Sequence, residues 1–222
     1  MPIYFCPRQK IRILFVHVPK CGGGSVEKFF RDNGFVEDLF LIDSRLAHYC
    51  CSPQHWHRDL LLKVVKMSSI DYIFTIVRDP VDRLVSEYKW RIKHPSTSKG
   101  FDNWYQHSRI MYDSDPFVFD NHLRPQVEFI LPGCDVYHFG SGLQNIVDHI
   151  SLKLGIVFDI PYIANQKEGA NFKRAGSDPV LLRRLSKSSP SSQSIQCIRV
   201  DYNDDFELIH RFSDGKLVFK SD

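Results

Sequence analysis

The stretch IRILFVHVPKCGGGS, residues 11–25, decides the fold. Its first half is a near-continuous apolar run over residues 11–18, which is typical of a strand that is covered on both faces. A proline, a lysine and three glycines follow, and a helical stretch then runs from about Ser25 to Asn33 before Gly34. A glycine loop between a strand and a helix presents backbone N–H groups and a helix N-terminus to an anion. The stretch therefore predicts an α/β fold with an anion-binding loop.

A second stretch of the same kind, YIFTIVRDPVDRLVSEYKWR, covers residues 72–91. Residues 72–77 predict another buried strand, and the Asp-Pro pair after Arg78 is typical of a helix start. The guanidinium of an arginine at a strand end can hold a phosphate in a bidentate fork. Two anion sites on one sheet indicate a ligand that carries phosphates at both ends of a nucleoside.

The rest of the chain continues the alternation of strands and helices. We expect one domain over residues 1–222, an α/β fold with a central, mostly parallel sheet flanked by helices and the ligand at the carboxyl ends of the strands. The further predicted elements are a helix over 58–65, a strand over 135–139, a helix over 143–154, a helix over 178–185, a polar loop over 187–194, and a last amphipathic stripe over 195–212 that breaks near Asn203.

Composition and charge fit a single domain of this size. Of the 222 residues, 43% are hydrophobic and 13% aromatic, which is enough for a full core. The net charge of +3 is too small for nucleic-acid binding through bulk electrostatics, so a local basic cleft is the better interpretation.

Cysteine spacing and hydropathy bear on metal binding and location. The six cysteines show no paired metal-ligand spacing, so we expect reduced thiols and no metal. The N-terminal residues lack the apolar run of a signal peptide or anchor, and no stretch is long enough to span a membrane. We therefore expect a cytoplasmic protein.

The two motifs together resemble the sulfotransferases that use 3′-phosphoadenosine 5′-phosphosulfate (PAPS), most closely the carbohydrate branch known as family 2. HVPKCGGGS at residues 17–25 is similar to the HIPKTGGTS of that branch, and VRDPVDRLVSEY at 77–88 is similar to its VRDPxERLVSxY. Weaker likeness continues over 121–130 and 201–212. The resemblance implies the P-loop-like sulfotransferase fold, PAPS as co-substrate with 3′,5′-adenosine bisphosphate as product, and a hydroxyl acceptor on a saccharide.

The resemblance also implies roles for the residues of both motifs. Lys20 would stabilise the leaving 5′-phosphate, because sulfuryl transfer resembles phosphoryl transfer in building charge on the leaving group. Arg78 and Ser86 would hold the 3′-phosphate. The full set of predicted nucleotide-binding residues is Lys20, Cys21, Gly22, Gly23, Gly24, Ser25, Arg78 and Ser86. The alternatives are a tight glycine turn with a solvated lysine, and an Arg78 that pairs with Asp79 or Asp82.

A hydroxyl acceptor needs a base, and histidine suits that task at neutral pH. The segment SPQHWHRD at residues 52–59 lies where the family carries its catalytic histidine, so His55 is the first choice and His57 the second. The alternative is a surface loop ahead of the next helix. His17 precedes the glycine loop within a strand and is better interpreted as a hydrogen-bonded core residue.

The segment NHLRPQ at residues 121–126 resembles a family segment near the acceptor. It predicts substrate contacts from Arg124 and Gln126, with His122 as the reserve base. The alternative is an ordinary helix start at Pro125. Arg83 stays open between a ligand contact and a salt bridge to Asp79 or Glu87.

Two other function classes remain open. A P-loop kinase or NTPase is disfavoured, because the loop lacks GxxxxGK[ST] and its lysine precedes the glycines. A non-catalytic nucleotide- or glycan-binding protein that retains the fold would keep the anion loop without turnover.

Overall fold

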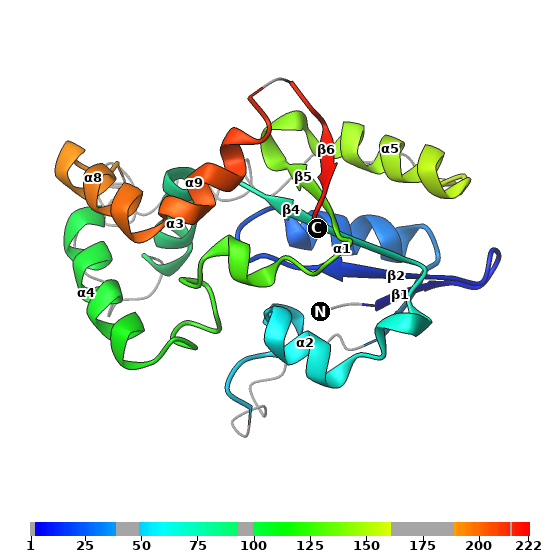
Figure 1. Cartoon of the computed structure of the whole chain (residues 1–222), viewed down its shortest axis with the longest axis horizontal. Coiled ribbons are helices and arrows are strands. Elements are labelled where there is room, and N and C mark those ends of the chain that lie inside the picture. The colour runs from blue at the N-terminus through cyan, green and yellow to red at the C-terminus, as the bar shows by residue number, and fades with distance from the viewer. Residues whose placement is uncertain (1–2, 39–48, 93–99, 161–188, 214) are drawn as a thin grey trace, which may run out of the picture.

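The structure, a computed structural model, describes residues 3–38, 49–92, 100–160, 189–213 and 215–222. A six-stranded mixed sheet runs through its centre in the order β3-β1-β2-β4-β5-β6 (Figure 1). The helix predicted over 178–185 lies outside the described residues. The strands are β1 Ile3–Cys6, β2 Ile11–Val16, β3 Val36–Asp38, β4 Tyr72–Val77, β5 Asp135–His138 and β6 Val218–Lys220.

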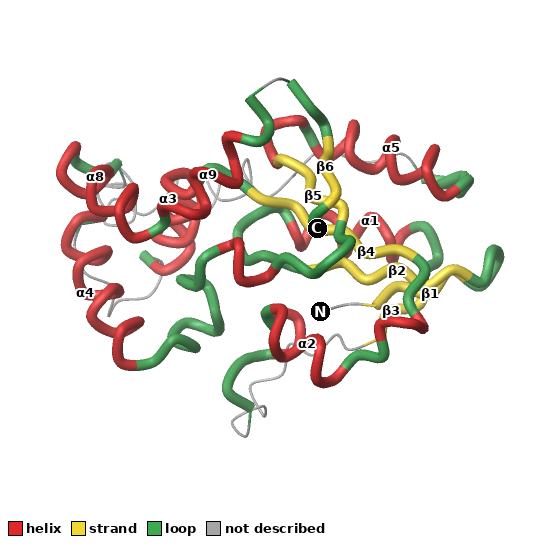
Figure 2. The backbone as a smooth tube through the Cα atoms, viewed as in Figure 1, coloured by secondary structure: helices red, strands yellow, loops and turns green. Residues whose placement is uncertain are grey.

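Helices lie against the sheet and beyond one end of it. Figure 2 shows α3, α4, α8 and α9 gathered at one end of the molecule, whereas α1, α2 and α5 lie along the sheet. The helices are α1 Gly23–Asp32, α2 Arg58–Val64, α3 Pro80–Arg91, α4 Phe101–Ser114, α5 Leu143–Leu154, α8 Ser192–Asp201 and α9 Asn203–His210. Short 3₁₀ turns are η1 Pro53–His55, η2 Met67–Ser69, η3 Gln126–Phe129 and η4 Phe139–Ser141.

The centre of the sheet is parallel, as the sequence predicts. Strand β2 pairs with β4 and β4 pairs with β5, all in the same direction. The edges differ, because β1, β3 and β6 pair antiparallel to their neighbours. Only four residues join β1 to β2, and so short a link permits a hairpin but no parallel crossover.

Helix boundaries follow the predicted patterns with two differences. Helix α1 starts at Gly23, earlier than expected, because Gly22 takes the left-handed conformation (φ +87°) that turns the chain into the helix. The polar loop predicted over 187–194 is wrong at its end: Ser191 caps α8, whose first residue is Ser192. The expected break near Asn203 is confirmed at Tyr202, between α8 and α9.

Three clusters of buried apolar side chains hold the described residues together, and the smallest comprises Val77, Val136, Leu208 and Phe212. The largest includes Phe15 and Phe74 of the sheet and Phe30 of α1. The second lies under α3, α4 and α8 around Tyr88 and Trp104. Among the described residues, no helix has both the length and the apolar character needed to cross a membrane.

Candidate active site

The glycine loop connects β2 to α1 and takes an unusual backbone path. Lys20 has a φ of +69°, a conformation that non-glycine residues rarely adopt, and Gly22 follows with +87°. Gly22 caps α1 without a side-chain hydrogen bond, and the first turn of α1 holds no acidic residue. The first N–H groups of a helix have no partner within it, so this end of α1 is suited to an anion.

A histidine ring fixes how closely the loop approaches the sheet. A Cβ on Gly23 would lie 2.0 Å from Nε2 of His17, so only glycine fits at this position. His17 is buried, and its Nδ1 lies 2.8 Å from Oε1 of Glu27 on α1. The interpretation of His17 as a paired core residue is therefore confirmed.

The two sequence motifs meet at the ring of Phe139, just after β5. A Cβ on Gly22 would lie 2.9 Å from this ring, and the guanidinium carbon of Arg78 lies 4.8 Å from its centre. Nε of Arg78 is buried and has no hydrogen-bond partner among the described residues. The alternative ion pair with Asp82 is loose, at 3.9 Å, and Asp79 instead caps α3. Arg78 thus keeps donor capacity for an anion.

Gln126 ties the two motifs together beneath this site. Its Oε1 accepts hydrogen bonds from the backbone N of Arg78 at 2.9 Å and from the Cys21 thiol at 3.4 Å. Its Nε2 donates to the carbonyl of Arg78, and its backbone N donates to the buried carboxylate of Asp205 on α9. Gln126 is fully buried, so its amide positions the loop and the arginine. Burial also raises the pKa of the Cys21 thiol to about 12.

Lys20 points toward helix α3. Its Nζ lies 5.1 Å from the centre of the Trp90 ring and 4.0 Å from Oε2 of Glu87. Ser86, on the same helix, is half-buried. These α3 residues belong to the motif that follows β4, so the side chain of Lys20 brings the first motif into contact with the second.

Three histidine rings lie in a row beside this lysine. The centres of the His17 and His55 rings are 5.0 Å apart, and those of His55 and His122 are 4.7 Å apart. Each ring has its own carboxylate: Glu27 for His17, Asp120 for His55 and Glu87 for His122. His55, Asp120 and His122 also bring potential metal-ligand atoms within 4.8 Å of one another. Because His55 and His122 each hydrogen-bond a carboxylate, we interpret them as hydrogen-bonded pairs.

His55 occupies the middle of the row, and its side chain is almost completely buried. Its Nδ1 lies 2.7 Å from Oδ2 of Asp120, which also accepts from the Ser52 hydroxyl. Burial lowers the pKa of His55 to about 3, despite the opposing effect of Asp120. Burial would raise the pKa of Asp120, yet the hydrogen bonds from His55 and Ser52 hold it well below its ordinary value.

A strained turn presents Asp120 to His55. Residues 119–121 all have φ between +57° and +64°, and none is glycine. Such conformations persist only where surrounding contacts hold them, and they concentrate at functional sites. Asn121 provides one such contact by donating to the carbonyl of His55 at 2.9 Å.

His57 and Arg124 lie apart from the histidine row. His57 precedes α2, with its ring centre 5.8 Å from that of Phe117. Arg124 is buried over the same Phe117 ring, where it donates to Asn121 and pairs with Glu128. The structure therefore brings together Lys20, His55 and His122, and places His57 and Arg124 apart from them, buried beside Phe117.

One face of α3 holds the segment that carries His122. Arg83 is fully buried and donates to the carbonyls of His122 and Arg124, at 3.1 Å and 3.0 Å. One turn later, Glu87 pairs with His122, and after another turn Arg91 covers the Phe119 ring. The sequence left Arg83 open between a ligand contact and a salt bridge to Asp79 or Glu87, but its guanidinium donates to these two carbonyls instead.

Sequence reasoning missed the carboxylates of the site. Glu27 and Asp120 belong to no recognisable motif, and Glu87 lies in the second motif, where its spacing indicates Arg83 as the partner. The histidines of the three carboxylates lie 10 to 65 positions away. The one available signal was the spacing of Arg83, Glu87 and Arg91, which places three charges on one helix face.

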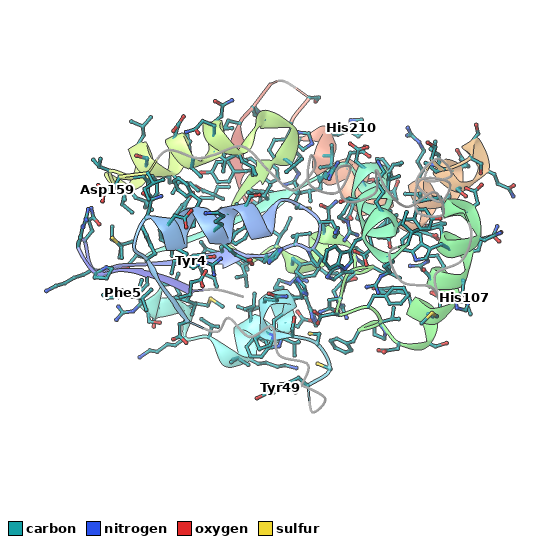
Figure 3. The ribbon with its side chains drawn as sticks, turned by 180° about the vertical axis from the view of Figure 1, so that it is seen from behind. Tyr4, Phe5, Tyr49, His107, Asp159 and His210 are labelled. Atoms are coloured by element: carbon teal, nitrogen blue, oxygen red, sulfur yellow. The ribbon has the colours of Figure 1, made fainter. Side chains whose placement is uncertain are left out.

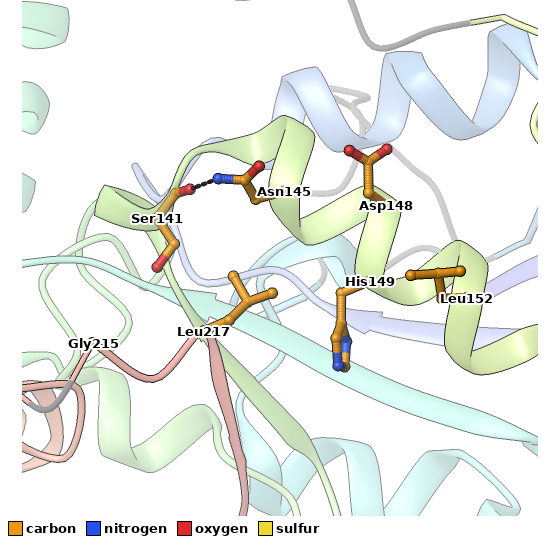
Figure 4. Close-up of a pocket in the computed structure, with 7 residues that line it drawn as sticks. All are labelled: Ser141, Asn145, Asp148, His149, Leu152, Gly215 and Leu217. Atoms are coloured by element: carbon orange, nitrogen blue, oxygen red, sulfur yellow. Dashed lines mark hydrogen bonds between the residues drawn. The ribbon is translucent and has the colours of Figure 1, made fainter.

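A separate hollow of about 500 Å³ lies between α5 and the chain leading into β6. Figure 4 shows Asn145 of its wall donating to the carbonyl of Ser141, a bond of 2.8 Å. None of the residues that line this hollow is a predicted site residue.

Comparison with known proteins identifies the family of the chain. No curated protein and no solved structure matches the chain. The family model described as the sulfotransferase family matches residues 2–210, which include the glycine loop, Arg78 and the histidine row. The chain therefore belongs to the sulfotransferase family.

Proposed function

We propose that this sulfotransferase takes its sulfuryl group from PAPS and transfers it to a hydroxyl of a saccharide. The observation that carries the donor assignment is the meeting of two anion-binding motifs at the Phe139 ring. Among the described residues, the start of α1 has no side-chain cap and Nε of Arg78 has no hydrogen-bond partner, which supports the 5′-phosphate at the first and the 3′-phosphate at the second.

Catalysis would use Lys20 and a histidine in an in-line displacement. Lys20 lies between the glycine loop and α3, where its ammonium can meet the charge that develops on the leaving phosphate. His55, His57 and His122 are the candidates for the base that takes the acceptor proton. The saccharide acceptor is supported by the resemblance of HVPKCGGGS and VRDPVDRLVSEY to the carbohydrate branch.

The test of the donor site is a calorimetric comparison of nucleotides. We expect 3′,5′-adenosine bisphosphate to bind at least about tenfold more tightly than 5′-AMP, since a charge-assisted contact contributes about 1.5–3 kcal/mol. Arg78→Ala should remove this preference. Arg8→Ala is the matched control, because Arg8 is exposed in the turn before β2, at the opposite end of that strand.

Equal affinity for the two nucleotides would contradict the assignment of Arg78. Tight, magnesium-dependent binding of ATP would instead favour a kinase or NTPase. Binding of 3′,5′-adenosine bisphosphate without any transfer from labelled PAPS to a panel of unsulfated polysaccharides would favour a non-catalytic binding protein.

A further inference from the structure

One buried carboxylate lies between the loop lysine and a histidine. Glu87 is fully buried on α3, and its Oε2 lies 2.6 Å from Nδ1 of His122 and 4.0 Å from Nζ of Lys20. Its other oxygen pairs with Nε of Arg91. Lys20 and His122 therefore converge on a single oxygen atom, although they come from segments about a hundred residues apart in the sequence.

This contact sets which nitrogen of His122 can act. When Nδ1 donates its proton to a carboxylate, Nε2 is the basic nitrogen of the neutral ring. The pair also fixes the ring, because Arg83 holds the backbone of the same residue through its carbonyl. His122 is thus an oriented base next to the lysine that would face the leaving group.

The other two candidate bases are less suited to the task. The His55 side chain is 6% exposed against 14% for His122, and its ring lies between the rings of His17 and His122. Its lowered pKa makes it a weak base at neutral pH. His57 lies outside the row, against Phe117.

We infer that His122 removes the acceptor proton, and that Glu87 is the positioning residue that holds His122 and Lys20 for the same reaction; this rests on the proposed function. Nε2 of His122 takes the proton as the acceptor O–H bond breaks and the oxygen–sulfur bond forms. The sulfur–oxygen bond to the 5′-phosphate breaks at the same time, and Lys20 faces the electron pair left on the phosphate. Glu87 remains ionised and balances the imidazolium.

The effect of Glu87 on His122 predicts the direction in which the acid limb of the pH–activity profile should move. An anion beside the ring favours its protonated form, so the wild-type enzyme loses activity at a higher pH than one that carries an amide at position 87. Among the described residues, the charged and titratable groups that face His122 or its carboxylate are Glu87, Arg83, Arg91, Lys20, His55 and Asp120.

The experiment compares two matched carboxylate-to-amide variants, Glu87→Gln and Asp120→Asn. In protein bound to 3′,5′-adenosine bisphosphate, the ring signal of His122 is followed by NMR from pH 5 to 9. We expect Glu87→Gln to move its titration midpoint to lower pH by about one unit or more. Asp120→Asn, which alters the partner of His55, should move that midpoint less than Glu87→Gln does, because Glu87 is the carboxylate that contacts the His122 ring at 2.6 Å. A His122 signal that does not titrate in this range, or that follows Asp120→Asn alone, would overturn the inference.

Turnover provides the second measurement, with labelled PAPS and the unsulfated polysaccharides heparosan and chondroitin as acceptor probes. Glu87→Gln should lower kcat at least about tenfold and move the acid limb with the ring signal, while KM changes by less than about threefold. His122→Gln should lose about a hundredfold or more in kcat and keep its affinity for 3′,5′-adenosine bisphosphate.

A structural role for Glu87 would produce a different pattern. It would lower the melting temperature and the rate without moving the acid limb, and this result would overturn the inference. His122→Gln with wild-type turnover would do the same. A wild-type protein that prefers 5′-AMP over the bisphosphate would overturn the proposed function instead, so the two failures are distinguishable.

Discussion

At the scale of single residues, Lys20 has a strained backbone conformation and a side chain directed toward α3. A left-handed φ at a residue with a Cβ costs free energy of about 1 kcal/mol or more. Lys20, between β2 and α1, has such a φ. The path turns the side chain toward Trp90 and Glu87 on α3. Arg78, by contrast, lies over Phe139 with its Nε unpaired among the described residues. We therefore expect replacement of Lys20 and replacement of Arg78 to impair different properties of the enzyme.

Lys20→Ala should separate chemistry from binding. Its ammonium would act on charge that develops only during transfer, so turnover should fall at least about a hundredfold while affinity for 3′,5′-adenosine bisphosphate changes by less than about tenfold. Arg78→Ala should show the reverse, with most of its effect on nucleotide affinity. Single-turnover rates and calorimetry on both variants measure this. Near-wild-type turnover of Lys20→Ala would contradict the mechanism.

At the scale of elements, local pattern was sufficient for the units that carry the anion motifs. The strand over 72–77 is confirmed, and the Asp79 cap of α3 lies where the Asp-Pro pair predicts it. Both depend on nearby residues: an apolar run, a capping side chain and a proline in the first turn.

Elements and contacts that depend on distant partners could not be predicted in the same way. Strand β1 is only four apolar residues long, IYFC, and its position depends on hairpin pairing with β2, so the sequence analysis did not predict it. The histidine row is a stronger case. His55 meets Asp120 only because the strained turn at 119–121 docks on α3, and no pattern along the chain encodes that docking.

The junction of β2 and α1 yields a prediction at this scale. Gly23→Ala should destabilise the protein by more than about 2 kcal/mol, because the new Cβ would lie 2.0 Å from the His17 ring. In a His17→Ala background the same change should be neutral or stabilising, since alanine is the better helix former by about 1 kcal/mol. Urea unfolding of the four proteins gives the coupling. A cost that persists without the His17 ring would contradict this account of the loop.

At the scale of the whole molecule, ionisable groups buried between distant segments link folding to pH. Burial holds the pKa of His55 down at about 3, and it also lowers the pKa of His57. Glu87 is ionised in the fold with a pKa of about 2, because His122, Arg91 and Lys20 outweigh the effect of its burial. The folded state therefore resists taking up protons that the unfolded chain accepts.

The sign of the pH effect follows for each group. Unfolded His55 binds a proton below its ordinary pKa of 6.5, whereas the folded residue does so only near 3, so stability falls as the pH drops through this window. Glu87 contributes stability above its ordinary pKa of 4.5, and that contribution is lost toward pH 2. Acid should therefore destabilise the protein in two stages, with the buried histidines acting first.

The loss of stability that His55 causes in the first stage can be measured by comparison with the exposed His107. Between pH 6.5 and about pH 5, we expect the free energy of unfolding to fall by about 1–2 kcal/mol for His55 alone, at about 1.4 kcal/mol per unit. His55→Gln should flatten the slope by that amount, whatever it does to the absolute stability. His107→Gln should leave the slope unchanged, because His107 is exposed on the outside of α4 (Figure 3). Urea unfolding at four pH values measures the slopes, and equal slopes for the wild-type and His55→Gln proteins would show that His55 is not held neutral in the fold.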